Sequence, residues 1–152
     1  MLVEVHSTVN GSHMYLREFI GRCEEFADKY NSEANLEHQF AALTSSFFSP
    51  NPVFRMFVSI DNEGVVQAHA LVGVDEFMGS RTITIMQYWV DPPYKAPDED
   101  KEQFFEAIKL WAKDVGAKNM RIFARNKAVA RMFRMFYGFK ERERVEMLID
   151  ME

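Results

Sequence analysis

Cysteine is almost absent from this chain of 152 residues, because only Cys23 is present. No disulfide can therefore form within the chain. The sequence also has no run of about 20 apolar residues that would cross a membrane, and no secretory leader pattern at its amino end. These absences favour a reducing, cytoplasmic setting without a membrane partner. Cys23 lies on an apolar helical stripe, where we expect a small buried side chain.

Several signatures of catalytic and binding chemistry are missing as well. The histidines His6, His13 and His38 lack the spacing of metal ligands, and no Cys-x-x-Cys or His-Glu-x-x-His pattern occurs. The sequence has no Gly-x-Ser-x-Gly elbow, no phosphate loop of the Walker type and no dinucleotide-binding glycine pattern. It therefore predicts no metal site, and it argues against the common serine hydrolases and nucleotide-binding folds.

The composition is that of a folded protein with an uneven charge. Hydrophobic residues make up 47% of the chain and 14 residues are Phe, which predicts a single domain over residues 1–152 with a substantial core. The net charge of −5 argues against a nucleic-acid-binding protein. Residues 118–144 nevertheless hold nine of the 18 basic residues and carry +7, so the remainder carries −12. This basic segment suits a phosphate-bearing small molecule or an acidic partner, or it is a solvated helix face.

Apolar spacing predicts two helices and three strands in the first 90 residues. Leu2 to Val5 reads as an opening strand, and Asn10 or Ser12 is a candidate helix cap. Turn residues separate the later strands. The expected helices span about 12–30 and 36–47, with Phe40, Leu43 and Phe47 on one face of the second, and the expected strands span 53–60, 65–74 and 82–90.

The second half of the chain alternates helix and strand. A long helix is expected from an N-cap at Asp98 to Gly116, followed by a strand over 120–124. A second helix follows Asn126 and ends at Gly138. Alternating apolar residues over 145–151 predict a final strand. The resulting order, β-α-α-β-β-β-α-β-α-β, indicates an α/β protein with a central sheet covered by helices.

Two patches of sequence carry a family resemblance. The first patch lies at the end of the predicted strand 82–90 and reads Val90-Asp91-Pro92, followed by Tyr94-Lys95. The second patch is the predicted helix after Asn126, which contains Met132-Phe133 and ends at Gly138-Phe139. In this order the patches resemble the Gcn5-related N-acetyltransferase (GNAT) family. The resemblance implies a mixed, mostly antiparallel central sheet flanked by helices. It also implies an N-acyltransferase that moves an acetyl or other acyl group from acetyl-CoA or another acyl-CoA to an amine.

The same resemblance implies positions for the cofactor. Backbone N–H groups near Trp89 and Val90 would face the acyl carbonyl, and Lys95 and Asn126 would lie at the cofactor. The family's general acid is often a Tyr in the last helix, and Tyr137 is the Tyr nearest to that place in this chain.

The residues leave several candidates open for the general base. Asp75 and Glu76 directly follow the strand expected over 65–74, and His69 lies within that strand. The alternative interpretation is structural: Asp75 and Glu76 are then ordinary loop carboxylates, and His69 is a hydrogen-bonded histidine of the sheet. Gln87 is a polar residue in an apolar strand, so it lines a cleft or bonds across the sheet.

The phosphate loop departs from the family pattern. The family's loop needs Gly, because its backbone N–H groups approach the pyrophosphate closely at a helix start. Residues 95–100 read Lys-Ala-Pro-Asp-Glu-Asp, with no Gly and three carboxylates. This departure favours an alternative, a GNAT-like protein that has lost normal acetyl-CoA binding and acts by binding another protein. An RNA-binding module is a third hypothesis, without a signature to support it.

Overall fold

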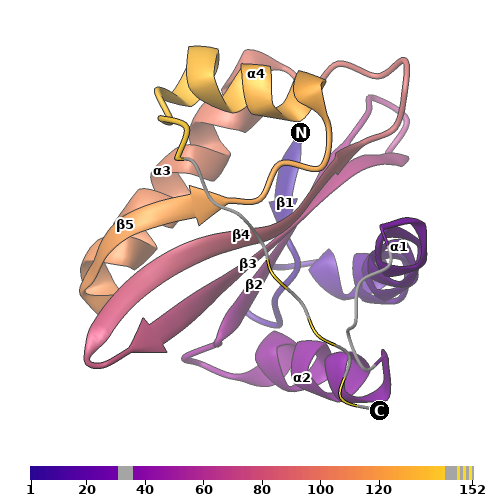
Figure 1. Ribbon diagram of the computed structural model, residues 1–152. Coiled ribbons are helices and arrows are strands. Elements are labelled where there is room, and N and C mark those ends of the chain that lie inside the picture. The colour runs from indigo at the N-terminus through magenta and orange to yellow at the C-terminus, as the bar shows by residue number, and fades with distance from the viewer. Residues whose placement is uncertain (31–35, 143–146, 148, 150, 152) are drawn as a thin grey trace.

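The computed structural model describes residues 1–30, 36–142, 147, 149 and 151 (Figure 1). A 3-10 helix over Ser12–Tyr15 precedes the first α-helix. The four described α-helices are α1 (Leu16–Lys29), α2 (Leu36–Phe48), α3 (Asp98–Val115) and α4 (Lys127–Tyr137). The five described strands are β1 (Leu2–Glu4), β2 (Phe54–Ile60), β3 (Val66–Phe77), β4 (Ser80–Val90) and β5 (Ala117–Ile122).

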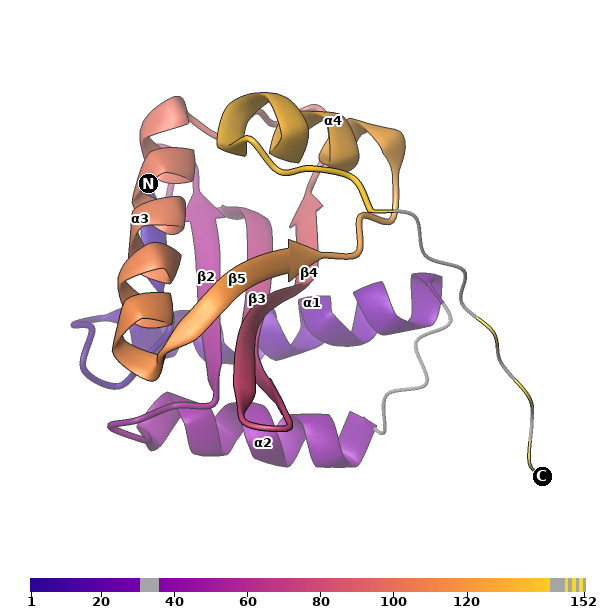
Figure 2. The ribbon, with the colours of Figure 1, turned by 60° about the vertical axis from the view of Figure 1, so that its left-hand side comes forward.

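The strands form one sheet in the order β1-β2-β3-β4-β5. The first three pairings are antiparallel, and β5 runs parallel to β4. Helices α1 and α2 cover one face and α3 and α4 the other, as Figure 2 shows. We call these the α1 face and the α3 face. The predicted mixed, mostly antiparallel sheet flanked by helices is confirmed.

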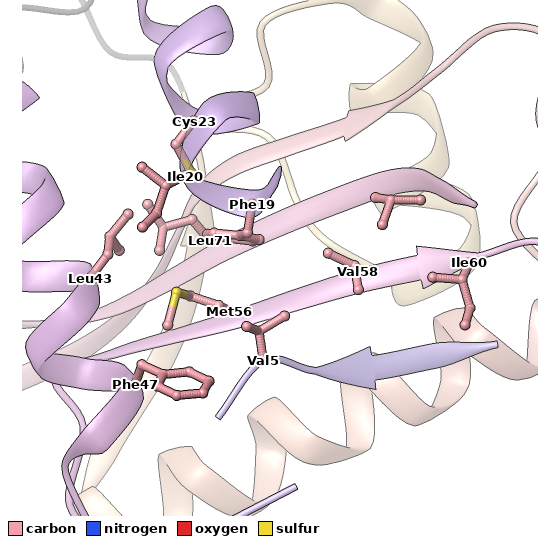
Figure 3. Close-up of a cluster of buried hydrophobic side chains, with 11 residues drawn as sticks. Val5, Phe19, Ile20, Cys23, Leu43, Phe47, Met56, Val58, Ile60 and Leu71 are labelled. Carbon is pink, nitrogen blue, oxygen red and sulfur yellow. The ribbon is translucent and has the colours of Figure 1, made fainter. Parts of the chain in front are cut away.

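Side chains alternate along the strands and pack into two separate cores, one on each face of the sheet. Met56 and Val58 point to the α1 face, whereas Phe57 between them points to the α3 face. The core on the α1 face is shown in Figure 3. Its buried members are Val5, Phe19, Ile20, Cys23, Leu43, Phe47, Met56, Val58, Ile60, Val66 and Leu71. The core on the α3 face is built from Phe57, Ala70, Val72, Ile83, Ile85, Phe104, Ile108, Trp111 and Phe133.

A tight hairpin joins β3 to β4. Met78 and Gly79 both have positive φ, at 50° and 80°, which is the backbone of a two-residue type I′ turn. Because this turn is so short, both strands extend further toward it than the apolar pattern indicates. Glu76 is therefore part of β3, at the end of the sheet that carries the hairpin.

Several local predictions were wrong in detail. Neither Asn10 nor Ser12 caps a helix: Gly11 occupies the N-cap position of the 3-10 helix, and the Ser12 hydroxyl donates to the His6 carbonyl, at 2.6 Å. Asp98 is the first residue of α3, and Pro97 occupies the N-cap position. Phe40, expected on the buried face of α2, is 53% exposed.

The later elements agree more closely with the pattern. The strand expected over 120–124 is β5, which begins three residues earlier and ends at Ile122. Gly116 and Gly138 have φ of 72° and 74° and end α3 and α4 as expected. Most of the strand expected over 145–151 lies outside the described residues. Of its apolar members, Met147, Ile149 and Met151 are described, and all three are exposed.

Candidate functional site

The carboxyl half of β4 has a free edge. Pairing with β5 ends at Ile85 and Ile122, whereas β4 continues to Val90. At this point the pairing with β3 skips Met86, which makes a β-bulge. A bulge bends and twists its strand, and it lies where β4 and β5 part. We call residues 87–90 of β4 the free edge, since no described strand pairs with them on the β5 side.

Hydrogen-bond alternation shows which amides this edge presents. The Asp91 N–H donates to the Gln67 carbonyl on β3, at 2.8 Å. In an antiparallel pair, every second residue exchanges bonds with the partner strand and the residues between point the other way. The backbone N–H groups of Tyr88 and Val90 therefore point toward the free edge. They are hydrogen-bond donors at fixed positions for a group that carries an oxygen.

The predicted residues Trp89 and Val90 lie at this edge, but Glu76 does not. Trp89 is opposite His69 on β3, whereas Glu76 is opposite Arg81 near the hairpin. Trp89 lies eight residue steps further along β4 than Arg81, roughly 27 Å at about 3.4 Å per residue. Glu76 is exposed, with its carboxylate 3.7 Å from the Arg81 guanidinium. The structure thus separates the predicted base from the predicted cofactor residues.

Tyr137 joins α4 to α3. Its hydroxyl donates to the Lys101 backbone carbonyl at 2.8 Å. Its ring lies 4.6 Å from Phe105 and 5.1 Å from Phe133, centroid to centroid. Burial raises the pKa of this phenol, with Tyr88 adding to the shift. The hydroxyl predicted as the general acid is therefore engaged with the backbone of the neighbouring helix.

Asn126 and Lys95 have different surroundings. The Asn126 side-chain oxygen accepts the Val129 N–H at 2.8 Å and caps α4. Lys95 is exposed in the segment between β4 and α3. On α4, Arg134 pairs with Glu141 at 2.7 Å. The cationic groups near the start of α4 are exposed and include Lys127.

The start of α3 is closed to anions by its own side chains. No side chain caps it, and its first turn carries three carboxylates. Asp98 lies 3.6 Å from Lys101. Asp100 is 5% exposed and accepts a hydrogen bond from the Ser59 hydroxyl at 2.6 Å. These carboxylates already satisfy the positive end of the helix dipole. The hollow between this helix start and Tyr88 measures only about 30 Å³.

On the α1 face, the residues around the free edge form a polar network that is buried at His69 and Gln87 and partly exposed at Asp91. Arg22 on α1 donates two hydrogen bonds to the Asp91 carboxylate, at 2.9 and 3.0 Å. Its Nε donates to His69 Nδ1 at 3.2 Å. His69 Nε2 therefore carries the proton, and it donates to the Gln87 side-chain oxygen at 3.0 Å. Gln87 in turn donates to the Cys23 carbonyl at 3.4 Å.

This network explains the state of His69. Burial lowers the pKa of its imidazole to about 4, against the opposing effect of the Gln87 hydrogen bond. With both ring nitrogens hydrogen-bonded, the side chain bridges α1 and β4. Sequence reasoning proposed His69 as a base and Gln87 as a cross-sheet partner, and the second of these is observed. It missed Arg22, whose only signal is a charged residue beside an apolar helix stripe.

The described residues offer neither a metal cluster nor a membrane segment. No group of three or more His, Cys, Asp or Glu side chains in the described ranges is placed to hold a metal ion. None of the described helices is both long and apolar enough to cross a membrane. The arrangement at the free edge of β4 can instead bind an extended, oxygen-bearing group through backbone amides.

Comparisons with known proteins place this arrangement in a known fold. No protein-family model matches the sequence, and no curated protein matches it. Solved structures do match. A predicted acetyltransferase with acetyl-CoA from Clostridium acetobutylicum superposes with a TM-score of 0.69 at 11% identity, covering 98% of this chain and 95% of that one.

An aminoglycoside N-acetyltransferase, AAC(6')-Iy, matches in two states. Its complex with CoA has a TM-score of 0.67 at 16% identity, covering 99% of this chain and 94% of the other. Its complex with a bisubstrate analogue, CoA-S-monomethyl-acetylneamine, has a TM-score of 0.66 at 16% identity and covers 99% and 97%. At these identities the likeness shows the fold, and this chain has the fold of the GNAT acetyltransferases.

Proposed function

We propose that this chain is an N-acyltransferase that moves an acetyl or other acyl group from acyl-CoA to an amine. The observation that carries the proposal is the free edge of β4, with the N–H groups of Tyr88 and Val90 pointing away from β3. Solved structures of the same fold contain CoA or acetyl-CoA. In the proposal, one domain over residues 1–152 performs the reaction in the cytoplasm, and buried Cys23 suits such a reducing compartment.

The proposed reaction uses backbone groups for its main stabilising contact. The unprotonated amine attacks the thioester carbonyl, and the carbonyl oxygen becomes an oxyanion. The Val90 N–H donates to that oxyanion, and such donors are typically worth 10²- to 10³-fold in rate. The C–S bond then breaks, the amide forms, and the thiolate leaves.

Proton transfer in the proposal runs through water. Glu76 lies at the hairpin end of the sheet, and His69 has both ring nitrogens hydrogen-bonded. In the proposal, the amine therefore loses its proton to water at the free edge of β4. A thiol has a pKa of about 8.5, so the thiolate leaves without an acid and takes a proton from solvent. Tyr137 would serve as acid only if its bond to Lys101 opened.

Cofactor phosphates would bind beside the start of α3, at cationic side chains and not at its backbone N–H groups. Its carboxylates repel a diphosphate, whereas Lys95 and Lys127 are exposed cations. We propose that these two lysines hold the CoA phosphates, with Asn126 shaping the start of α4 beside them. In this proposal, charged side chains bind the phosphates in place of the backbone N–H groups of a glycine-rich loop.

Thermal unfolding with acetyl-CoA tests the proposal. A ligand at 100 times its Kd stabilises the folded state by about 2.7 kcal/mol, which raises the Tm of a chain of this size by roughly 5–10 °C. Acetyl-CoA with an amine should also release free thiol, and Val90→Pro should slow that release by about 10²-fold. The control Val53→Pro lies outside the sheet and should leave the rate unchanged. Unchanged Tm at millimolar acetyl-CoA contradicts the proposal.

A second candidate is a non-catalytic protein-binding module with this fold. The closed start of α3, with Asp100 buried against Ser59, favours it. The small hollow beside Tyr88 also favours it. This candidate expects no stabilisation by CoA, together with capture of a protein partner that CoA does not release. Stabilisation by CoA together with thiol release from acetyl-CoA would contradict a non-catalytic module.

A further inference from the structure

A second hollow lies on the α1 face beside the free edge of β4. Its volume is about 180 Å³, which is room for several water molecules. We call it the α1-face pocket. Its lining residues are Arg22, Glu25, Phe26, Lys29, Tyr30, His69, Trp89 and Asp91.

Aromatic rings in this pocket already hold an ammonium group. The Lys29 Nζ atom lies 3.9 Å from the centroid of the Trp89 ring and 5.7 Å from that of Tyr30. Both distances are within the range of cation–π attraction. The Tyr30 ring is 6.3 Å from Trp89 and 4.7 Å from Phe26, centroid to centroid. The Trp89 and Tyr30 rings thus form a site whose geometry suits an alkylammonium ion, with Phe26 packed against Tyr30, and Lys29 shows that such a group fits.

The charges of the lining favour a cation once Lys29 leaves. The Arg22 guanidinium is neutralised by its paired hydrogen bonds to Asp91. His69 is neutral at pH 7, because burial lowers the pKa of its imidazole to about 4. Glu25 and Lys29 are the other charged side chains in the lining, and their opposite charges cancel. Displacing Lys29 leaves one net negative charge beside the rings.

The pocket also has the right position for an acceptor. Trp89 is the residue between Tyr88 and Val90, whose N–H groups point to the free edge. We propose that the α1-face pocket binds a primary alkylammonium ion, with Lys29 as an exchangeable internal occupant, and that the acceptor amine reaches the free edge from this pocket. Its role as the acceptor site rests on the proposed function, whereas ammonium binding does not.

Calorimetric titration of the full chain with n-butylammonium, without CoA, tests ammonium binding. Lys29→Ala should bind the probe at least about threefold more tightly, because the competing group is gone. Trp89→Leu should weaken binding by roughly two- to thirtyfold, the range expected for loss of a cation–π contact of about 0.5–2 kcal/mol. Tyr30→Leu, a milder change outside the sheet, should weaken it by a smaller factor.

Two controls separate this site from general amine binding. Lys109 lies over the Phe105 ring at 5.3 Å on α3, so Lys109→Ala removes a similar pair away from the pocket and should leave the affinity unchanged. Neutral n-butanol has the same alkyl chain and should not saturate the site. Equal binding of butanol and butylammonium overturns the proposal. So does an affinity that Lys29→Ala leaves unchanged or lowers.

Failure of this proposal is distinguishable from failure of the proposed function. Butylammonium binding without thiol release from acetyl-CoA keeps the ammonium site and removes its role as the acceptor site. Thiol release that proceeds equally in the wild type, Lys29→Ala and Trp89→Leu keeps the acyltransferase and overturns the pocket as its acceptor site.

Discussion

The two sides of the last residues of β4 are held by different forces. On the α3 face, Tyr88 packs against Phe133 and Phe104, with ring centroids 5.1 and 6.0 Å apart. On the α1 face, His69 and Gln87 are held by a chain of hydrogen bonds from Arg22. Apolar contacts do not depend on pH, whereas the polar network requires a neutral imidazole. The difference shows that one strand end can be packed tightly on one face and remain polar and hollowed on the other.

The largest expected effect is on the α3 face. Phe133 is 1% exposed, so Phe133→Ala should lower the free energy of unfolding by about 3–5 kcal/mol through lost contacts and a new cavity. Phe136 lies on the same helix but is 38% exposed, and Phe136→Ala should cost less than about 1 kcal/mol. Urea denaturation at pH 5 and pH 7 measures both. Similar costs for the two variants would contradict the packing of α4 through Phe133.

The next effect separates the two faces by pH. Because burial holds the folded pKa of His69 at about 4 and the unfolded value is about 6.5, its stabilising contribution is complete above pH 6.5. It should be lost as the pH falls toward 4, by up to about 3 kcal/mol. His69→Gln should abolish this part of the pH dependence.

A matched variant isolates the imidazole in that experiment. His13 is exposed on the 3-10 helix, so His13→Gln should keep the pH dependence of the wild type. Carboxylates also titrate in this range, so the quantity to compare is the difference between each variant and the wild type. A His69→Gln curve parallel to that of the wild type would show that the polar network does not set the pH response.

A smaller effect is expected from Arg22. Its guanidinium makes two bonds to Asp91 and one to His69, and an ammonium cannot reproduce this fork. Arg22→Lys should therefore lower the free energy of unfolding by about 1–3 kcal/mol. Arg17 is exposed on the same helix, and Arg17→Lys should change it by less than about 0.5 kcal/mol. Chemical denaturation of both variants decides whether the network stabilises the α1 face.

The smallest expected effect concerns the charge at the start of α3. The double variant Asp98→Asn with Glu99→Gln removes two carboxylates that oppose a diphosphate. Each such charge near a helix start is worth about 0.3–1 kcal/mol, so CoA affinity should rise roughly three- to thirtyfold. Glu102→Gln, one turn later, should change it less. Unchanged affinity in calorimetry would show that the phosphates bind far from this helix.

The α3 face was the more predictable of the two from sequence. Phe104, Ile108 and Phe133 follow helical spacing, so their burial could be read from the pattern and is observed. Met132 and Val129 follow the same spacing and are half-buried. Asn126 and Gly138 marked the ends of α4 because capping depends on local residue chemistry.

The polar network could not be predicted, because its members are distant in the sequence. Arg22, His69 and Asp91 come together only when α1 packs on the ends of β3 and β4. The separation of Glu76 from Val90 depends on which end of β3 the hairpin occupies. Trp89 and Val90 were predicted as candidate site residues only from the family resemblance, because a role of the backbone needs no particular side chain.

Backbone amide chemical shifts during titration with acetyl-CoA test the central claim most directly. If the acyl group binds along the free edge of β4, the Tyr88 and Val90 amide resonances should move together and saturate. The Glu76 and Arg81 amides, at the hairpin end of the same sheet, should stay in place. Saturable shifts confined to the hairpin end, or no shifts at millimolar acetyl-CoA, would contradict acyl transfer at the end of β4.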